Sequence, residues 1–142
     1  MKKIRLFVAA LFVLICGVFG FAACKKDGKA EATLLSVTDT QVVLRVDKVE
    51  GDAVLIDALE DLQDKGELTF TCSGGMITAI NDIKNGANYN PCWMIYTSDS
   101  EMANTEWGTV EYDGQTLGSA VLGVEELTVI KGGVYVFDYQ TF

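Results

Sequence analysis

The feature that most limits how this chain can fold is an uninterrupted, uncharged and mostly apolar run at residues 6–23. Lys2, Lys3 and Arg5 precede the run, and a positive end followed by an apolar run is typical of a targeting segment. Such a run does not belong to the core of a small domain. It leaves room for one folded domain in the rest of the 142-residue chain.

The apolar run ends in Phe21-Ala22-Ala23-Cys24, which resembles the lipobox where bacterial lipoprotein signal peptides are cleaved after lipidation. By this resemblance residues 1–23 are a signal peptide, Cys24 is lipidated, and residues 24–32 are a polar tether to a domain at 33–142. Two alternatives stay open: ordinary cleavage after small residues, and an uncleaved anchor, because 18 apolar residues can just span a bilayer. The lipoprotein interpretation places the domain on the extracytoplasmic face of the cell membrane.

The exported part is strongly acidic. Removing residues 1–23 takes away three of the 11 basic residues and none of the 20 acidic ones, which leaves a formal charge of 8 − 20 = −12. This charge disfavours nucleic acid as a partner, and its simplest role is solubility.

Two cysteines remain in the expected domain, Cys72 and Cys92. An exported location permits a disulfide between them, which would stabilise the fold by about 3 kcal/mol through loop closure. The alternative is a pair of buried free thiols that pack as small hydrophobes.

The first half of the domain alternates between strand and helix signals. Residues 34–46 alternate apolar and polar side chains and predict one strand with a buried side. Asp52 is a suitable N-cap for an amphipathic helix at 53–65 that ends at Gly66. The acidic side of this helix is interpreted as a solvated face. Two short strands at 68–72 and 76–80 flank Ser73-Gly74-Gly75 and predict a hairpin.

The second half reads almost entirely as strands and turns. Residues 92–99 form the most apolar and aromatic segment and predict the central core strand, with polar loops at 81–91 and 98–106 on either side. Asp113-Gly114 predicts a hairpin between 107–112 and 115–117, and Lys131-Gly132-Gly133 predicts another between 124–130 and 134–139. One helix followed by runs of strands is an α+β pattern.

Several of these segments together resemble the transcobalamin-like C-terminal domain family, which includes a domain of unknown function in lipoproteins of Gram-positive gut bacteria. The resemblance implies a β-grasp-like mixed sheet of short strands and hairpins that carries one helix. In the animal transport proteins the related domain caps cobalamin against a separate helical domain, so a cobalamin-type ligand and a partner domain are implied here. The segments are Leu55-Ile56-Asp57-Ala58-Leu59, Gly75-Met76-Ile77-Thr78-Ala79-Ile80-Asn81, Trp93-Met94-Ile95-Tyr96 and Tyr135-Val136-Phe137-Asp138-Tyr139.

The residue types argue against an enzyme. The chain contains no histidine, which removes imidazole-based nucleophile activation and imidazole ligation of zinc, haem or cobalt. Paired carboxylates remain as the enzymatic option, and Asp99 with Glu101 is the pair weighed for calcium, but acids are abundant throughout and the EF-hand spacing is absent. We therefore expect no catalytic residues and no metal site.

Aromatic side chains give the better functional signal. Alternation places Trp93 and Tyr96 on opposite faces of the central strand. With Trp107 and Tyr112 they are the candidate ligand-binding residues, because exposed aromatics beside amides and hydroxyls suit a corrinoid or another small molecule. The alternative function is a cell-surface module that binds a protein or a glycan, and the alternative role for the aromatics is core or cover packing.

Overall fold

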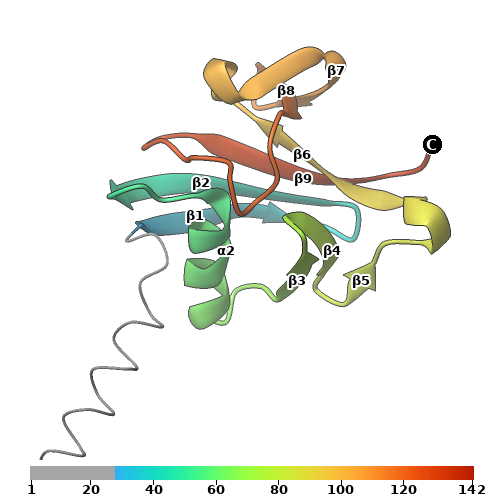
Figure 1. The fold of residues 1–142 in the computed structure, drawn as a ribbon, viewed down its shortest axis with the longest axis horizontal. Helices are drawn as coiled ribbons and strands as arrows, with labels where there is room; N and C mark the ends of the chain where they lie inside the picture. The colour runs from blue at the N-terminus through green and yellow to red at the C-terminus, as the bar shows by residue number, and fades with distance from the viewer. Residues whose placement is uncertain (1–27) are drawn as a thin grey trace, which may run out of the picture.

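The computed structural model describes residues 28–142 and contains a large antiparallel sheet, a small antiparallel sheet and one helix (Figure 1). The large sheet has the strand order β1-β2-β9-β6-β8-β7, and the small one has the order β3-β4-β5. Their bounds are β1 Lys29–Val37, β2 Gln41–Glu50, α2 Leu55–Asp64, β3 Phe70–Ser73, β4 Met76–Ile80, β5 Ile83–Lys84, β6 Cys92–Thr97, β7 Ala103–Tyr112, β8 Gln115–Ala120 and β9 Val134–Gln140, with short 3₁₀ turns η1 Ala87–Tyr89 and η2 Ser100–Met102.

The α+β expectation of a sheet with one helix is confirmed for residues 28–142. The expected mixed sheet is wrong, because every pair of neighbouring strands described here is antiparallel. The expected signal peptide at 1–23 and the lipidated Cys24 lie outside the described residues. No helix within residues 28–142 is both long and apolar enough to cross a membrane.

The first strand pair differs from the sequence-based expectation. The single strand predicted at 34–46 is two strands, β1 and β2, joined by a turn in which the Thr38 hydroxyl accepts hydrogen bonds from the backbone N–H groups of Thr40 and Gln41. The tether expected at 24–32 is also too long. Its last four residues belong to β1, where alternation buries Ala30 and Ala32 against the core.

The helix begins later than predicted, but its buried face is the predicted one. Val54 is the N-cap in place of Asp52, and the Asp57 carboxylate accepts a hydrogen bond from Val54 N–H at 2.8 Å, which satisfies one free donor of the first turn. Gly66 follows the helix with a φ of +73°, the left-handed conformation expected there. The helix buries Leu55, Ala58, Leu59 and Leu62.

The segment predicted as a strand at 124–130 is instead a covering segment over the start of the helix. Only an isolated bridge joins Thr128 to Val54. Leu127 and Val124 direct their carbonyls to the N–H groups of Leu55 and Ile56, at 2.8 and 2.9 Å. The predicted final hairpin is therefore wrong, because this apolar segment satisfies the open donors of the helix rather than pairing with β9.

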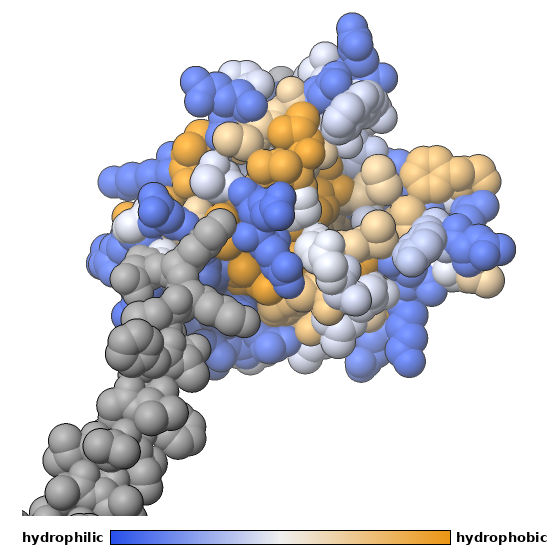
Figure 2. Space-filling model, viewed as in Figure 1, coloured by the Kyte–Doolittle hydropathy of each residue, from blue (hydrophilic) through white to orange (hydrophobic). Residues whose placement is uncertain are grey.

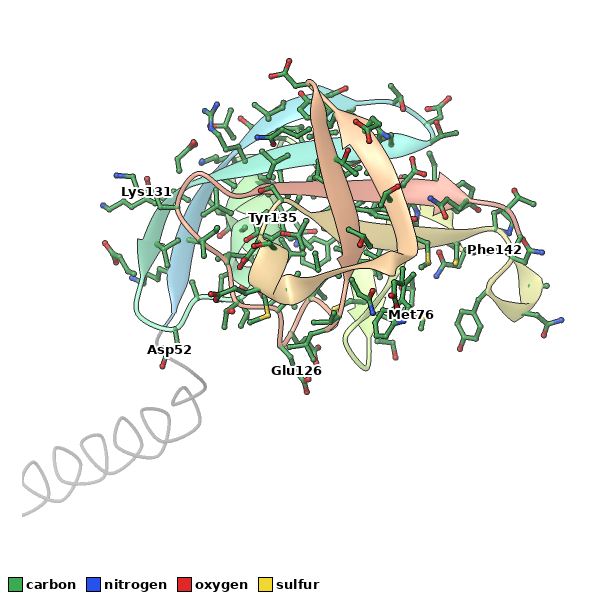
Figure 3. All side chains as sticks on the ribbon, turned by 90° about the horizontal axis from the view of Figure 1, so that it is seen from above. Asp52, Met76, Glu126, Lys131, Tyr135 and Phe142 are labelled. Carbon is green, nitrogen blue, oxygen red and sulfur yellow. The ribbon has the colours of Figure 1, made fainter. Side chains whose placement is uncertain are left out.

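Both faces of the large sheet are covered. One face packs against α2 in the main core, which includes Tyr135 and Phe137 of β9. On the opposite face Tyr96, Val43, Leu117 and Val136 form a second cluster, over which the β7–β8 hairpin folds (Figure 3). The predicted Asp113-Gly114 turn of this hairpin is confirmed, with φ values of +48° and +76°. The core strand predicted at 92–99 is confirmed as β6, Cys92–Thr97.

The ends of the domain are well separated. The described chain enters at Gly28, beside the start of β1, whereas the η1 turn and the C-terminus lie together at the other end of the large sheet (Figure 1). Phe142 and Asn90 exchange two hydrogen bonds there, each of 2.9 Å.

Candidate functional site

The four aromatic residues predicted to bind ligand do not form one surface. Trp93 and Tyr96 lie on opposite faces of β6 as predicted, but their exposed fractions are only 4 % and 3 %. Tyr112 is half-buried against the second cluster, and Trp107 is 64 % exposed on β7. Both side chains are almost fully buried and help to fill the two cores, so their contact with a ligand stays a prediction.

Trp107 is exposed because β7 contains an irregularity. Asn104 pairs with Ser119 and Thr109 pairs with Gly118, so residues 105–108 have no partners on β8. Such a bulge turns side chains out of the sheet. It leaves Trp107 on the outside of the hairpin, away from the lining of the cleft described below.

Trp93 forms hydrogen bonds with the segment that follows β4. Its indole Nε1 donates to the Ile83 carbonyl at 2.8 Å, and its backbone N–H donates to the Asn85 side-chain oxygen at 3.0 Å. Its ring lies 5.0 Å from the ring of Tyr139, whose hydroxyl donates to the Lys84 carbonyl. Two aromatic residues of the large sheet thus hold β5 in place from behind.

On the outer side of this loop lies a cleft of about 550 Å³, which we call the Tyr89 cleft. It is bounded by the outer side of the β3–β4 hairpin, by β5 and by the η1 turn. Its lining offers hydroxyls, side-chain amides, one ammonium group and one phenol ring: Thr71, Thr78, Ala79, Lys84, Asn85, Gly86, Asn88 and Tyr89.

Side-chain hydrogen bonds fix the shape of the Tyr89 cleft. The amide of Asn85 donates to the Ile77 carbonyl at 2.8 Å while its oxygen accepts from Trp93, so this residue joins β4, β5 and β6. The hydroxyls of Thr71 and Thr78 are 2.7 Å apart across the hairpin. The hydrogen bonds between Asn90 and Phe142 close the far end of the loop. A site held in this way loses little conformational entropy when a ligand binds.

Two of the five non-glycine residues with positive φ among residues 28–142 line the cleft. Asn88 and Tyr89 have φ values of +56° and +58°, a conformation that costs a residue with a side chain roughly 1–2 kcal/mol. Tyr89 is also 62 % exposed, so its ring gains little from packing. Strain that is not compensated by burial commonly marks a functional position. The sequence contained only a weak signal for this site, the Asn- and Gly-rich composition of residues 85–90.

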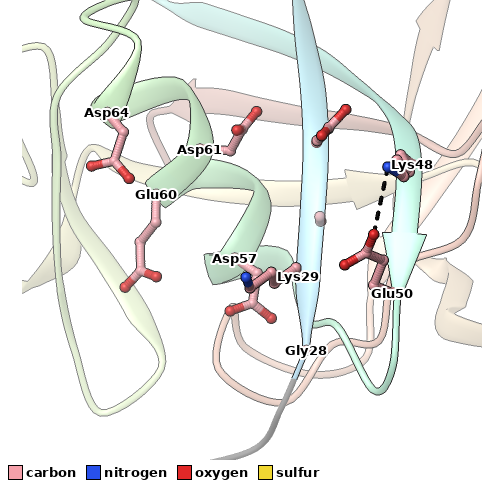
Figure 4. Close-up of a pocket in the computed structure, with 10 residues that line it drawn as sticks. Gly28, Lys29, Lys48, Glu50, Asp57, Glu60, Asp61 and Asp64 are labelled. Carbon is pink, nitrogen blue, oxygen red and sulfur yellow. Dashed lines mark ion pairs between the residues drawn. The ribbon is translucent and has the colours of Figure 1, made fainter. Parts of the chain in front are cut away.

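A second hollow, of about 430 Å³, lies between α2 and the ends of β1 and β2 (Figure 4). Asp57, Glu60 and Asp64 line its helix side, and burial together with the charges of Asp57 and Asp64 raises the pKa of Glu60. Lys48 forms an ion pair of 3.5 Å with Glu50 on the strand side. Within residues 28–142 no group of three or more side chains is arranged to hold a metal ion.

The remaining candidates have structural roles. Asp99 is buried, and its carboxylate accepts from Glu101 N–H at 3.1 Å, which caps η2. Cys72 and Cys92 are free thiols, the second of the two arrangements considered from the sequence. Burial raises the pKa of both thiols, so neither is activated as a nucleophile.

The fold and cleft define a small α+β domain with an open surface cleft. No protein-family model matches the chain, and no curated protein and no solved structure matches it either.

Proposed function

We propose that this protein is a non-enzymatic, extracytoplasmic binding domain, tethered to the cell membrane through Cys24, and that its ligand occupies the Tyr89 cleft. The observation that carries the proposal is the exposed, strained Tyr89 ring beside a fixed set of amides and hydroxyls. The lining has no carboxylate, thiol or imidazole, which leaves Lys84 and Tyr89 as its only titratable side chains.

The chemistry of the lining selects a neutral ligand rich in amide or hydroxyl groups. Asn85 and Asn88 can both donate and accept hydrogen bonds, as can the two threonines, and the Tyr89 ring offers an apolar face for stacking. Lys84 is the one charged lining residue, whereas residues 28–142 carry 6 − 19 = −13 and repel free anions. A corrinoid with peripheral amides meets this description, and so does an uncharged glycan.

The corrinoid choice rests on the resemblance to the transcobalamin-like C-terminal domain family, although the antiparallel pairing differs from the mixed sheet that this resemblance implies. One helix packed across one face of a sheet is consistent with that resemblance. The cleft is small beside a corrin ring, so a corrinoid would lie across its mouth, with a partner domain on its other face. A glycan would place a single sugar ring inside.

A titration can separate these ligands. The full chain in detergent carries two tryptophans, so a Trp107→Phe background leaves Trp93, which contacts the β5 loop, as the fluorescent reporter. We expect cyanocobalamin or a neutral oligosaccharide to change its emission, and Tyr89→Ala to weaken binding about tenfold. Because the corrin ring absorbs light, isothermal titration calorimetry checks each result.

Trp107→Ala is the matched control, an exposed aromatic away from the cleft, and it should leave calorimetric affinity unchanged. Flat titrations with both ligand classes up to about 1 mM, or equal binding by the Tyr89→Ala variant, would remove the cleft as the binding site.

The membrane tether has a separate test. Cys24→Ser should move the protein from the membrane fraction to the soluble fraction, since the acyl chains supply the membrane affinity. Unchanged partitioning would instead support an uncleaved anchor.

A further inference from the structure

A groove next to β6 gathers exposed apolar side chains. This β6 groove has a volume of about 310 Å³, and Met76 and Leu122, which are 47 % and 39 % exposed, lie among its lining residues. Val121, which precedes Leu122, is also exposed. Met76, Val121 and Leu122 are three of the eight large apolar residues exposed within residues 28–142. Apolar colour gathers on this face in Figure 2 as well. Exposed apolar residues gathered around a hollow commonly mark an interaction site.

The floor of the β6 groove is rigid backbone. Gly75 of the β3–β4 turn accepts a hydrogen bond of 2.9 Å from Val124 N–H, and a Cβ added to Gly123 would lie only 2.5 Å from the Gly75 oxygen. The absence of side chains there lets the two segments meet. Among its lining residues Ile95 is half-buried, Ile77 and Trp93 are almost fully buried, and no charged residue lines the groove.

One wall of the groove is a partly open strand edge. β9 pairs with all six residues of β6, whereas β8 pairs only with Tyr96 and Thr97 before it turns away. Met94 directs its backbone groups to β9, and Trp93 N–H is bonded to Asn85, so the stretch of β6 that faces the β8 side without a strand partner among the described residues is short. An extended peptide could form a few backbone hydrogen bonds with this stretch while an apolar side chain fills the groove.

The negative charge of the domain indicates which side chains such a peptide should carry. Glu125 and Glu126 follow Gly123 as exposed residues, Glu126 lies on the same side of the molecule as Met76 (Figure 3), and residues 28–142 carry −13. A second copy of this chain would bring the same negative charge to the contact. We propose that the β6 groove binds an extended segment of another protein, with an apolar side chain seated in the groove and basic residues on either side of it.

The test uses two synthetic peptides of equal charge, Ac-KVKVKVK-amide and Ac-KSKSKSK-amide, with ¹⁵N-labelled full chain in detergent. We expect the valine peptide to bind at least about tenfold more tightly and to shift the amide signals of Met94, Ile95 and Gly123. Leu122→Asp should reduce that affinity about tenfold, whereas Ile130→Asp, which changes a similarly exposed residue outside the groove, should not.

Equal affinity for the two peptides would show attraction by charge alone and would overturn the proposal. Dimerisation through the same amides without peptide would also overturn it, in favour of a second copy. Neither result depends on the Tyr89 cleft, whose ligand is tested separately.

Discussion

The carboxylate of Asp61 on α2 accepts a hydrogen bond of 3.0 Å from the backbone N–H of Ala32 on β1. Lys65, one turn later at the C-cap of α2, donates a hydrogen bond of 3.1 Å to the Ala32 carbonyl and forms an ion pair of 2.7 Å with Asp61. The helix thereby occupies both backbone groups of Ala32 on the edge strand β1, which protects that part of the edge from other chains. Asp61 belongs to the acidic side of α2, which the sequence predicts to be a solvated face, so one residue of that face has a structural role.

Asp61→Ala should therefore lower the free energy of unfolding by about 1 kcal/mol, because Ala32 N–H and Lys65 lose a charged partner while alanine recovers some helix propensity. Asp64→Ala, at an exposed position on the same helix, should change it by no more than about 0.5 kcal/mol. Urea unfolding followed by circular dichroism measures both. Equal effects would mean that the contact with β1 contributes nothing to stability.

Asp47 predicts a dependence of stability on acid pH. Hydrogen bonds from the Thr33 hydroxyl and from Arg45 lower the pKa of Asp47. A lowered pKa contributes stability that is complete above the unfolded-state value of about 3.9 and is lost as the pH falls through the folded-state value. Asp47→Asn should then lose less stability than the natural chain between neutral pH and pH ~2.5. The same comparison for Asp52→Asn, at an exposed turn position, should show no such difference.

Gly123→Ala should destabilise the protein by about 1–3 kcal/mol, because the new methyl group meets backbone atoms of Gly75 that have no room to move. Gly114→Ala is the control. That position has a φ of +76° but open space around it, so its cost is the conformational strain of about 1 kcal/mol. Thermal unfolding of the two variants gives the comparison, and a smaller loss at position 123 would contradict the close contact.

The free thiols give a chemical prediction. Alkylation of the unfolded but unreduced chain should label both Cys72 and Cys92 in peptide mass mapping. In the folded chain labelling at neutral pH should be slow, because burial raises the pKa of each thiol and limits access. Recovery of a peptide pair joined by a disulfide would instead support the other arrangement considered from the sequence.

Local patterns predicted the parts of the fold that local chemistry determines. Asp113-Gly114 determines its turn through two residues that tolerate positive φ, and the 3.6-residue spacing of Leu55, Leu59 and Leu62 determines the buried side of α2. The alternation of β6 likewise placed Trp93 and Tyr96 on opposite faces.

The candidate site could not be predicted because distant residues build it. Trp93 appeared to be a ligand contact from its type alone, yet its indole bonds to Ile83 behind the Tyr89 cleft. The loop that carries Tyr89 is closed by a contact between Asn90 and Phe142, 52 positions apart. Similarly, residues 124–130 have a strand-like pattern, and only the open donors at Leu55 and Ile56 explain why they do not pair with β9.

The distance between the entry of the chain at Gly28 and the η1 turn has a mechanical consequence for a tethered protein. The seven-residue strand β9 alone extends roughly 23 Å toward the end that carries η1. If the bilayer holds the end beside Gly28, the Tyr89 ring points outward at the tip of a short stalk. The Tyr89 cleft could then bind a glycan of the cell wall or of a neighbouring cell without bringing that wall or cell into contact with the bilayer.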